Sequence, residues 1–169
     1  MGRKRAGYTL PVAYYMILVQ MRRVQENRII PIPPMQTWDL MRNLDLRPKW
    51  DRTILSVSRD EEFLYYVAPA LLGLHWLWKG EYITFEPPLR SAVRMAWGSR
   101  LRPFKYLVGS WILRPRESVT DLTMIVSFEP RLPLPMLGRI MEMRVKSLLK
   151  KSLSNLSNLA EQVRSDIDE

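Results

Sequence analysis

The sequence predicts an α+β fold in which a curved antiparallel sheet of about six to seven strands is wrapped around a long C-terminal helix. Three features of the chain lead to this prediction. Two short helical segments follow the first strand directly. Six segments rich in β-branched and aromatic residues come next, and the chain ends in a stretch with an apolar residue at every third or fourth position.

The first strand and the two short helices occupy residues 21–50. Residues 21–30 are rich in Val, Ile and Arg and are closed off by prolines, which is typical of a strand. A helix is expected from Pro34, because proline suits a first helical turn and Trp38, Met41 and Leu44 recur at spacings of three. A second short helix is expected over residues 46–50.

Six strands should follow, separated by turns that contain Pro or Gly. They are expected at residues 53–57, 63–67, 74–85, 91–97, 106–113 and 120–128. Apolar residues alternate with polar ones along the last of them, so that Leu122, Met124, Val126 and Phe128 share one face. This alternation predicts an antiparallel sheet with one buried face and one face in water.

The last helix is expected over residues 134–164. One stripe of this helix is apolar except for a serine and consists of Leu137, Met141, Val145, Leu148, Ser152, Leu156, Leu159 and Val163. At about 1.5 Å per residue it would measure roughly 45 Å, which is enough to cross the whole sheet.

The N-terminal 20 residues differ from the rest of the chain. Arg3, Lys4 and Arg5 precede an apolar run over residues 8–19, which is shorter than the roughly 20 apolar residues of a membrane-spanning helix and is not followed by a cleavage signal. We therefore expect residues 1–20 to be an extension, either a flexible one or an added strand segment. Residues 21–169 should form a single domain.

Composition excludes several kinds of site. The chain has no cysteine and only one histidine, His75, so it offers no thiol nucleophile, no thiolate metal site and no histidine cluster. No phosphate-binding glycine loop or nucleophile elbow is present. We predict no catalytic residue, no metal and no cofactor. The absence of cysteine favours a reducing compartment, and we expect a cytoplasmic protein.

Three stretches of sequence carry a family resemblance. Residues 30–40 read IPIPPMQTWDL, residues 46–51 read LRPKWD, and residues 80–92 contain GEY followed by FEPPLRSA. Together with the element order, these stretches resemble the helix-grip fold of the START-like (SRPBCC) superfamily, and most closely its polyketide cyclase/dehydrase-like and coenzyme-Q-binding groups. The resemblance implies a cavity between the sheet and the long helix that holds a hydrophobic molecule.

The inward face of the predicted sheet and helix supplies the candidate ligand-binding residues. They are aromatic, Met or Val side chains, namely Trp76, Trp78, Tyr82, Met95, Trp97, Met124, Phe128, Met141 and Val145. Aromatic rings give a large contact area and Met adapts to irregular shapes, as a ligand cavity requires. The alternative is that these side chains form a solid core.

Three functions remain open. The first is binding, or binding and transfer, of a lipid, quinone, polyketide or similar hydrophobic molecule. The second is a cyclase- or dehydratase-like enzyme of the polyketide cyclase/aromatase type, which polar groups in the cavity would favour. The third is a basic interaction module for an anionic membrane or nucleic acid, because the net charge is +9; of these two polyanions, nucleic acid is the less favoured.

Residues 98–105 are expected to be a hairpin tip. Arg100, Arg102 and Lys105 flank Leu101 and Phe104 there, and this mixture of basic and exposed apolar side chains suits peripheral contact with an anionic membrane. The alternative is an ordinary solvated hairpin. The oligomeric state is not predicted.

Overall fold

The computed structural model describes residues 21–69, 73–132 and 134–168, and the predicted extension over residues 1–20 lies outside this part of the chain. Within these residues, seven strands and three helices follow one another in the order that the sequence predicts. Their bounds are β1 (Arg22–Ile30), α2 (Pro34–Arg42), α3 (Arg47–Trp50), β2 (Ser56–Arg59), β3 (Leu64–Pro69), β4 (His75–Glu86), β5 (Arg90–Gly98), β6 (Phe104–Arg116), β7 (Val119–Pro130) and α4 (Pro135–Asp168).

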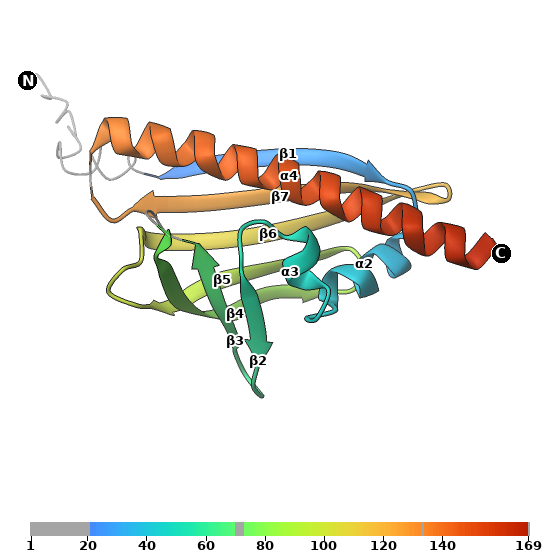
Figure 1. Ribbon diagram of the computed structural model, residues 1–169, viewed down its shortest axis with the longest axis horizontal. Helices are drawn as coiled ribbons and strands as arrows, with labels where there is room; N and C mark the ends of the chain where they lie inside the picture. Colours follow the sequence, from blue (N-terminus) through green and yellow to red (C-terminus); the bar gives the residue numbers. More distant parts are fainter. Residues whose placement is uncertain (1–20, 70–72, 133, 169) are drawn as a thin grey trace, which may run out of the picture.

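The seven strands form one antiparallel sheet in the order β1-β7-β6-β5-β4-β3-β2. Strands β2 to β7 form a meander, and β1 pairs with β7 at the far edge. The sheet is strongly curved, because β2 and β3 run steeply across the direction of β1 and β7 (Figure 1). Helix α4 runs along one face of the sheet beside β1 and β7 (Figure 1). The predicted α+β helix-grip fold is therefore confirmed.

The two short helices join the first strand to the core through buried contacts. Trp38 of α2 and Trp50 of α3 are almost completely buried, and the Trp50 ring lies 6.4 Å from that of Trp111 in β6. The Thr120 hydroxyl of β7 donates a hydrogen bond of 2.8 Å to the Ile32 carbonyl, which holds the turn after β1 against the sheet.

Strand β2 begins later than the sequence predicts. The segment before it is held in a turn, because Asp51 Oδ1 accepts hydrogen bonds from the backbone nitrogen of Thr53 at 3.0 Å and from its hydroxyl at 2.6 Å. This local side-chain bonding competes with strand pairing. Ser56 is the first residue that pairs with β3.

Helix α4 has two different halves. In its C-terminal half, Leu153, Leu156 and Ala160 are at most 2% exposed and belong to the main core. In its N-terminal half the apolar stripe is only partly buried, and Met136 and Met143 are exposed. The helix therefore packs tightly on the sheet along only part of its length. In the described part of the chain, no helix is long and apolar enough to span a membrane.

Candidate ligand-binding cavity

A cavity of about 700 Å³ lies between the sheet and the N-terminal half of α4. Helix α3 closes its inner end, and the segments around the β5–β6 and β7–α4 connections surround its mouth. A well-packed protein interior contains few voids larger than a water molecule, so a space of this size is a structural feature of its own. Ligand pockets are typically about 300–1,000 Å³, and this cavity falls in that range.

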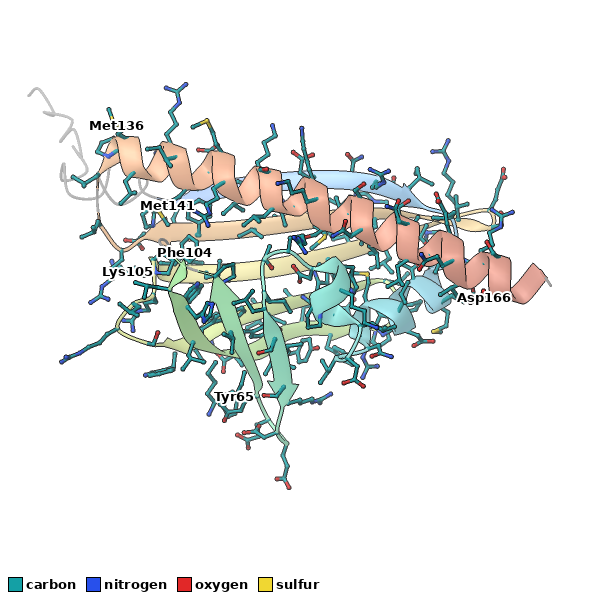
Figure 2. All side chains as sticks on the ribbon, viewed as in Figure 1. Tyr65, Phe104, Lys105, Met136, Met141 and Asp166 are labelled. Carbon is teal, nitrogen blue, oxygen red and sulfur yellow. The ribbon has the colours of Figure 1, made fainter. Side chains whose placement is uncertain are left out.

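Neither the helix wall nor the sheet wall fills this space. The side chains that α4 directs towards it, which include Leu137, Met141, Val145 and Leu148, are only partly buried. Figure 2 shows Met141 on the side of α4 that faces the sheet, while Met136 lies on the opposite side. On the sheet, Gly109 of β6 lines the cavity, and a Cβ atom at this position would meet no other heavy atom within 4 Å.

The walls are mainly aromatic and aliphatic. Trp76 and Trp78 of β4 have ring centroids 6.1 Å apart, and Phe104 of β6 packs edge-on against Trp76 at 5.7 Å. Met124 of β7 and Trp111 of β6 are cross-strand partners, and both line the cavity. These side chains present the large apolar contact area that a hydrophobic ligand needs.

The inner end of the cavity is polar. Arg47 of α3 donates a hydrogen bond from Nε to Asp51 Oδ2 at 2.8 Å, and their side chains are only 9% and 1% exposed. The Arg47 guanidinium also lies over the Trp111 ring at 4.2 Å and over the Trp50 ring at 4.9 Å. A buried ion pair of this kind needs close geometry and further hydrogen bonds to offset its loss of hydration.

Two hydroxyl groups accompany this ion pair. Tyr66 of β3 and Ser91 of β5 line the cavity and are each 3% exposed. The Tyr66 ring stacks on Trp78 with centroids 3.9 Å apart. Burial raises the pKa of the Tyr66 phenol above its usual value, and the positive charge of Arg47 opposes this shift only in part. Tyr66 is therefore a neutral hydroxyl at physiological pH.

The mouth of the cavity is apolar and basic. Leu74, Leu101, Leu132 and Ile140 line it and are each more than half exposed. Arg102, Arg131 and Arg144 are also part of the lining. Phe104 was expected to be exposed on the hairpin tip, and this prediction is wrong, because its ring packs inward against Trp76 and Phe128.

Five of the nine candidate ligand-binding residues line this cavity. They are Trp76, Trp78, Met124, Met141 and Val145. Phe128 is fully buried behind Phe104, with ring centroids 5.1 Å apart, and Met95 packs partly buried against the core. Tyr82 packs against Phe85 at 4.9 Å and does not reach the cavity.

Trp97 lies on the other face of the sheet, where it is 57% exposed. The cause is an irregularity in the pairing of β4 with β5. Lys79 pairs with Trp97 and Gly80 with Met95, so Ala96 is an extra residue in β5. One extra residue reverses the alternation of side chains beyond it, and Trp97 therefore points away from the face that Val93 occupies.

Sequence reasoning did not select Arg47, Asp51, Tyr66 or Ser91. The first two belong to the LRPKWD stretch, where a base and an acid four residues apart have the spacing of an ordinary pair on a helix surface. His75 is exposed on β4, and Glu81 forms an exposed ion pair with Arg94 on the next strand. Neither of them lines the cavity.

Comparison with known proteins agrees with this architecture. The family model described as polyketide cyclase/dehydrase and lipid transport matches residues 21–161. A search of the curated proteins gave no match.

Solved structures share the fold at low sequence identity. A START superfamily protein from Mycobacterium smegmatis is 14% identical, with 83% of this chain and 98% of that chain covered and a TM-score of 0.70. The Zhui aromatase/cyclase from Streptomyces sp. R1128 is also 14% identical, with 84% and 94% covered and a TM-score of 0.69. A conserved protein from Geobacillus kaustophilus is 14% identical, with 83% and 96% covered and a TM-score of 0.69. From the family match over most of its length, the chain belongs to the polyketide cyclase/dehydrase and lipid transport family.

Proposed function

We propose that the protein binds a hydrophobic small molecule in the cavity beneath α4 and carries it between sites of supply and use. One observation carries this proposal: a space of about 700 Å³ lies under the N-terminal half of α4 and is walled mainly by aromatic and aliphatic side chains. Filling such a space with an apolar molecule removes apolar surface of both partners from water, which favours binding. Lipid transport is one of the activities for which the family is named.

The glycine in the cavity wall provides the test. Leu107 and Trp111 lie on the same face of β6 as Gly109 and also line the cavity, so a leucine side chain at position 109 would enter open space. Gly109→Leu should therefore fold, and it should lose affinity for an apolar fluorescent probe such as N-phenyl-1-naphthylamine. We expect the wild-type protein to bind this probe with a sub-millimolar dissociation constant and the variant to bind about tenfold more weakly.

Ser110→Leu is the matched control, because Ser110 neighbours Gly109 in the strand and is not part of the cavity lining. Its affinity for the probe should equal that of the wild type. Failure of the wild type to bind, or equal binding by Gly109→Leu, would contradict the proposal.

A second candidate is an enzyme of the polyketide cyclase/aromatase type. The observation that favours it is the set of polar groups at the inner end of an otherwise apolar cavity, at Arg47, Tyr66 and Ser91. The two candidates differ in what happens to a reactive poly-β-ketone chain. A carrier should leave its rate of cyclisation unchanged or slow it, and an enzyme should accelerate it. The formation of aromatic product, followed by ultraviolet absorption, distinguishes the two outcomes.

For a carrier, we further propose that the mouth of the cavity docks on an anionic bilayer when the ligand enters or leaves. Leu101 and Leu132 are each 57% exposed there, Arg100, Arg102 and Lys105 lie around Leu101 in the sequence, and Arg144 lines the cavity. Each basic residue near an anionic bilayer contributes about 1 kcal/mol, and the leucines can enter the interface. The mouth thus combines apolar and basic side chains at the opening through which the ligand must pass.

Co-sedimentation with vesicles of phosphatidylcholine and phosphatidylserine tests this docking. The triple variant Arg100→Ser, Arg102→Ser, Lys105→Ser should bind the vesicles less than the wild type, and added salt should weaken binding. The control carries Arg28→Ser, Arg114→Ser and Arg116→Ser, which remove the same charge near the hairpin between β6 and β7, at the opposite end of the sheet. Equal loss of binding in both triple variants would mean that only net charge matters and would exclude a specific role of the mouth.

A further inference from the structure

We propose that the inner end of the cavity binds a neutral carbonyl oxygen of the ligand through Arg47, with the hydroxyl groups of Tyr66 and Ser91 beside it. The ligand would then be an apolar molecule with a ketone or ester group at the end that enters first. This inference rests on the proposed function, because it assigns a chemical class to the ligand of the same cavity.

Arg47 is held in a fixed orientation with donors to spare. Its Nε atom donates to Asp51, and its guanidinium is stacked over Trp111 and Trp50. Within the described chain, no acceptor bonds its terminal nitrogens Nη1 and Nη2. A guanidinium has five N–H groups, so the four on these two nitrogens remain available at a residue that lines the cavity. Because Arg47 lines the cavity, a ligand oxygen there can accept hydrogen bonds from these nitrogens.

The charge of the site favours a neutral acceptor over a carboxylate. Asp51 is 1% exposed and balances Arg47, so the pair has no net charge. The second Asp51 oxygen is already used by Thr53, whose backbone nitrogen and hydroxyl both donate to it. A ligand carboxylate would add an uncompensated negative charge near Asp51 in a poorly hydrated space, whereas a ketone or ester oxygen accepts the same hydrogen bonds without that cost.

Tyr66 and Ser91 extend this group of donors. Ser91 is the cross-strand partner of Trp111, over which the Arg47 guanidinium lies. Tyr66 packs in one buried cluster with Ile54, three residues after Asp51, and with Val93, two residues after Ser91. No hydrogen bond involves either hydroxyl within the described residues. Three side chains that are more than nine-tenths buried thus offer donors at one end of an otherwise apolar space.

The test compares three probes of almost equal shape: 2-acetylnaphthalene, 2-ethylnaphthalene and 2-naphthoate. We expect the ketone to displace a bound fluorescent probe from the wild-type protein at about tenfold lower concentration than the ethyl compound, since a hydrogen bond from a charged donor is among the stronger ones. The carboxylate should bind more weakly than the ketone. The infrared carbonyl band of the bound ketone should lie at lower wavenumber than in a hydrocarbon solvent.

Variants locate the effect. The double variant Arg47→Met, Asp51→Asn removes both charges, so that neither is left buried alone, and it should bind the ketone and the ethyl compound within about twofold of each other. Arg52→Met, at an exposed arginine of the same segment, should retain the wild-type preference. If the double variant does not fold, Tyr66→Phe and Ser91→Ala should each reduce the preference about threefold.

The possible outcomes separate this inference from the proposed function. If the wild type binds the ketone and the ethyl compound equally, the carbonyl site is wrong, but the cavity still binds apolar molecules. If the carboxylate binds most tightly, the inner end is an anion site and the neutral assignment is wrong. If none of the three probes binds, both proposals fail.

Discussion

The two halves of α4 should respond differently to the same substitution. Leu156 is fully buried and packs in the main core, outside the cavity. Leu148, two turns earlier, is only partly buried and lines the cavity. Leu156→Ala removes apolar contacts and leaves a new void, whereas Leu148→Ala only enlarges a space that is already open.

These differences set the expected free energies. A Leu→Ala change in a packed core costs about 2–5 kcal/mol, which includes a term of about 24 cal/mol for each Å³ of new void. For Leu148 the void term is absent, and about half of the transfer free energy of three methylene-sized groups at about 0.8 kcal/mol each gives roughly 1 kcal/mol. With about 3 kcal/mol for Leu156→Ala, the two variants should differ by about 2 kcal/mol, or about 4–8 °C in Tm for a chain of this size.

Urea unfolding followed by tryptophan fluorescence and circular dichroism measures both variants. Met143→Ala, at a residue that is 60% exposed on the same helix, provides the baseline and should change the free energy of unfolding by less than about 0.5 kcal/mol. If Leu148→Ala and Leu156→Ala destabilise the protein equally, the N-terminal half of α4 packs as solid core, and the cavity on which the proposed function rests is not open in solution.

Two further changes test the placement of individual side chains. Trp97→Ser should alter the free energy of unfolding by less than about 1 kcal/mol and leave the affinity for an apolar probe unchanged. Trp76→Leu, at a residue that is 4% exposed in the cavity wall, should reduce both the stability and the affinity. Equal effects of the two changes would mean that the β5 irregularity is misplaced. Because burial raises the pKa of the Tyr66 phenol, the folded protein holds that proton more tightly than the unfolded chain does. The free energy of unfolding should therefore fall as the pH rises above 10, by up to about 1.4 kcal/mol per pH unit. Tyr66→Phe should remove this contribution, and parallel losses of stability in the wild type and the variant between pH 10 and 11.5 would contradict the burial of the phenol.

The order of helices and strands could be predicted from the sequence because it depends on local patterns. Alternation along residues 120–128 and the spacing of apolar residues in the last helix each reflect a single strand or helix that packs with one face on an apolar layer. Residues that line the cavity from regular stretches of strand and helix, such as Trp76, Met124 and Met141, were selected for the same reason.

Register and the degree of packing depend on partners that are distant in the chain. Simple alternation would place Trp97 on the same face as Val93. Only the pairing of β5 with β4 reveals that Ala96 is an extra residue, which reverses the alternation before Trp97. The apolar stripe of α4 likewise has the same spacing along its whole length. Whether a part of it fills a core or borders a cavity depends on how closely the curved sheet approaches it.

The fold class and the apolar character of the interior follow from residue type and spacing along the chain, and the family follows from the resemblance of three stretches of sequence. Where the interior is left open and which polar groups face it depend instead on contacts between distant segments. Arg47 and Asp51 have the spacing of a solvated surface pair, and they are buried because Trp111, more than sixty residues later in the sequence, packs against the guanidinium. A contact between residues so far apart leaves no periodic signal in either segment, although it determines the polarity of the proposed binding site.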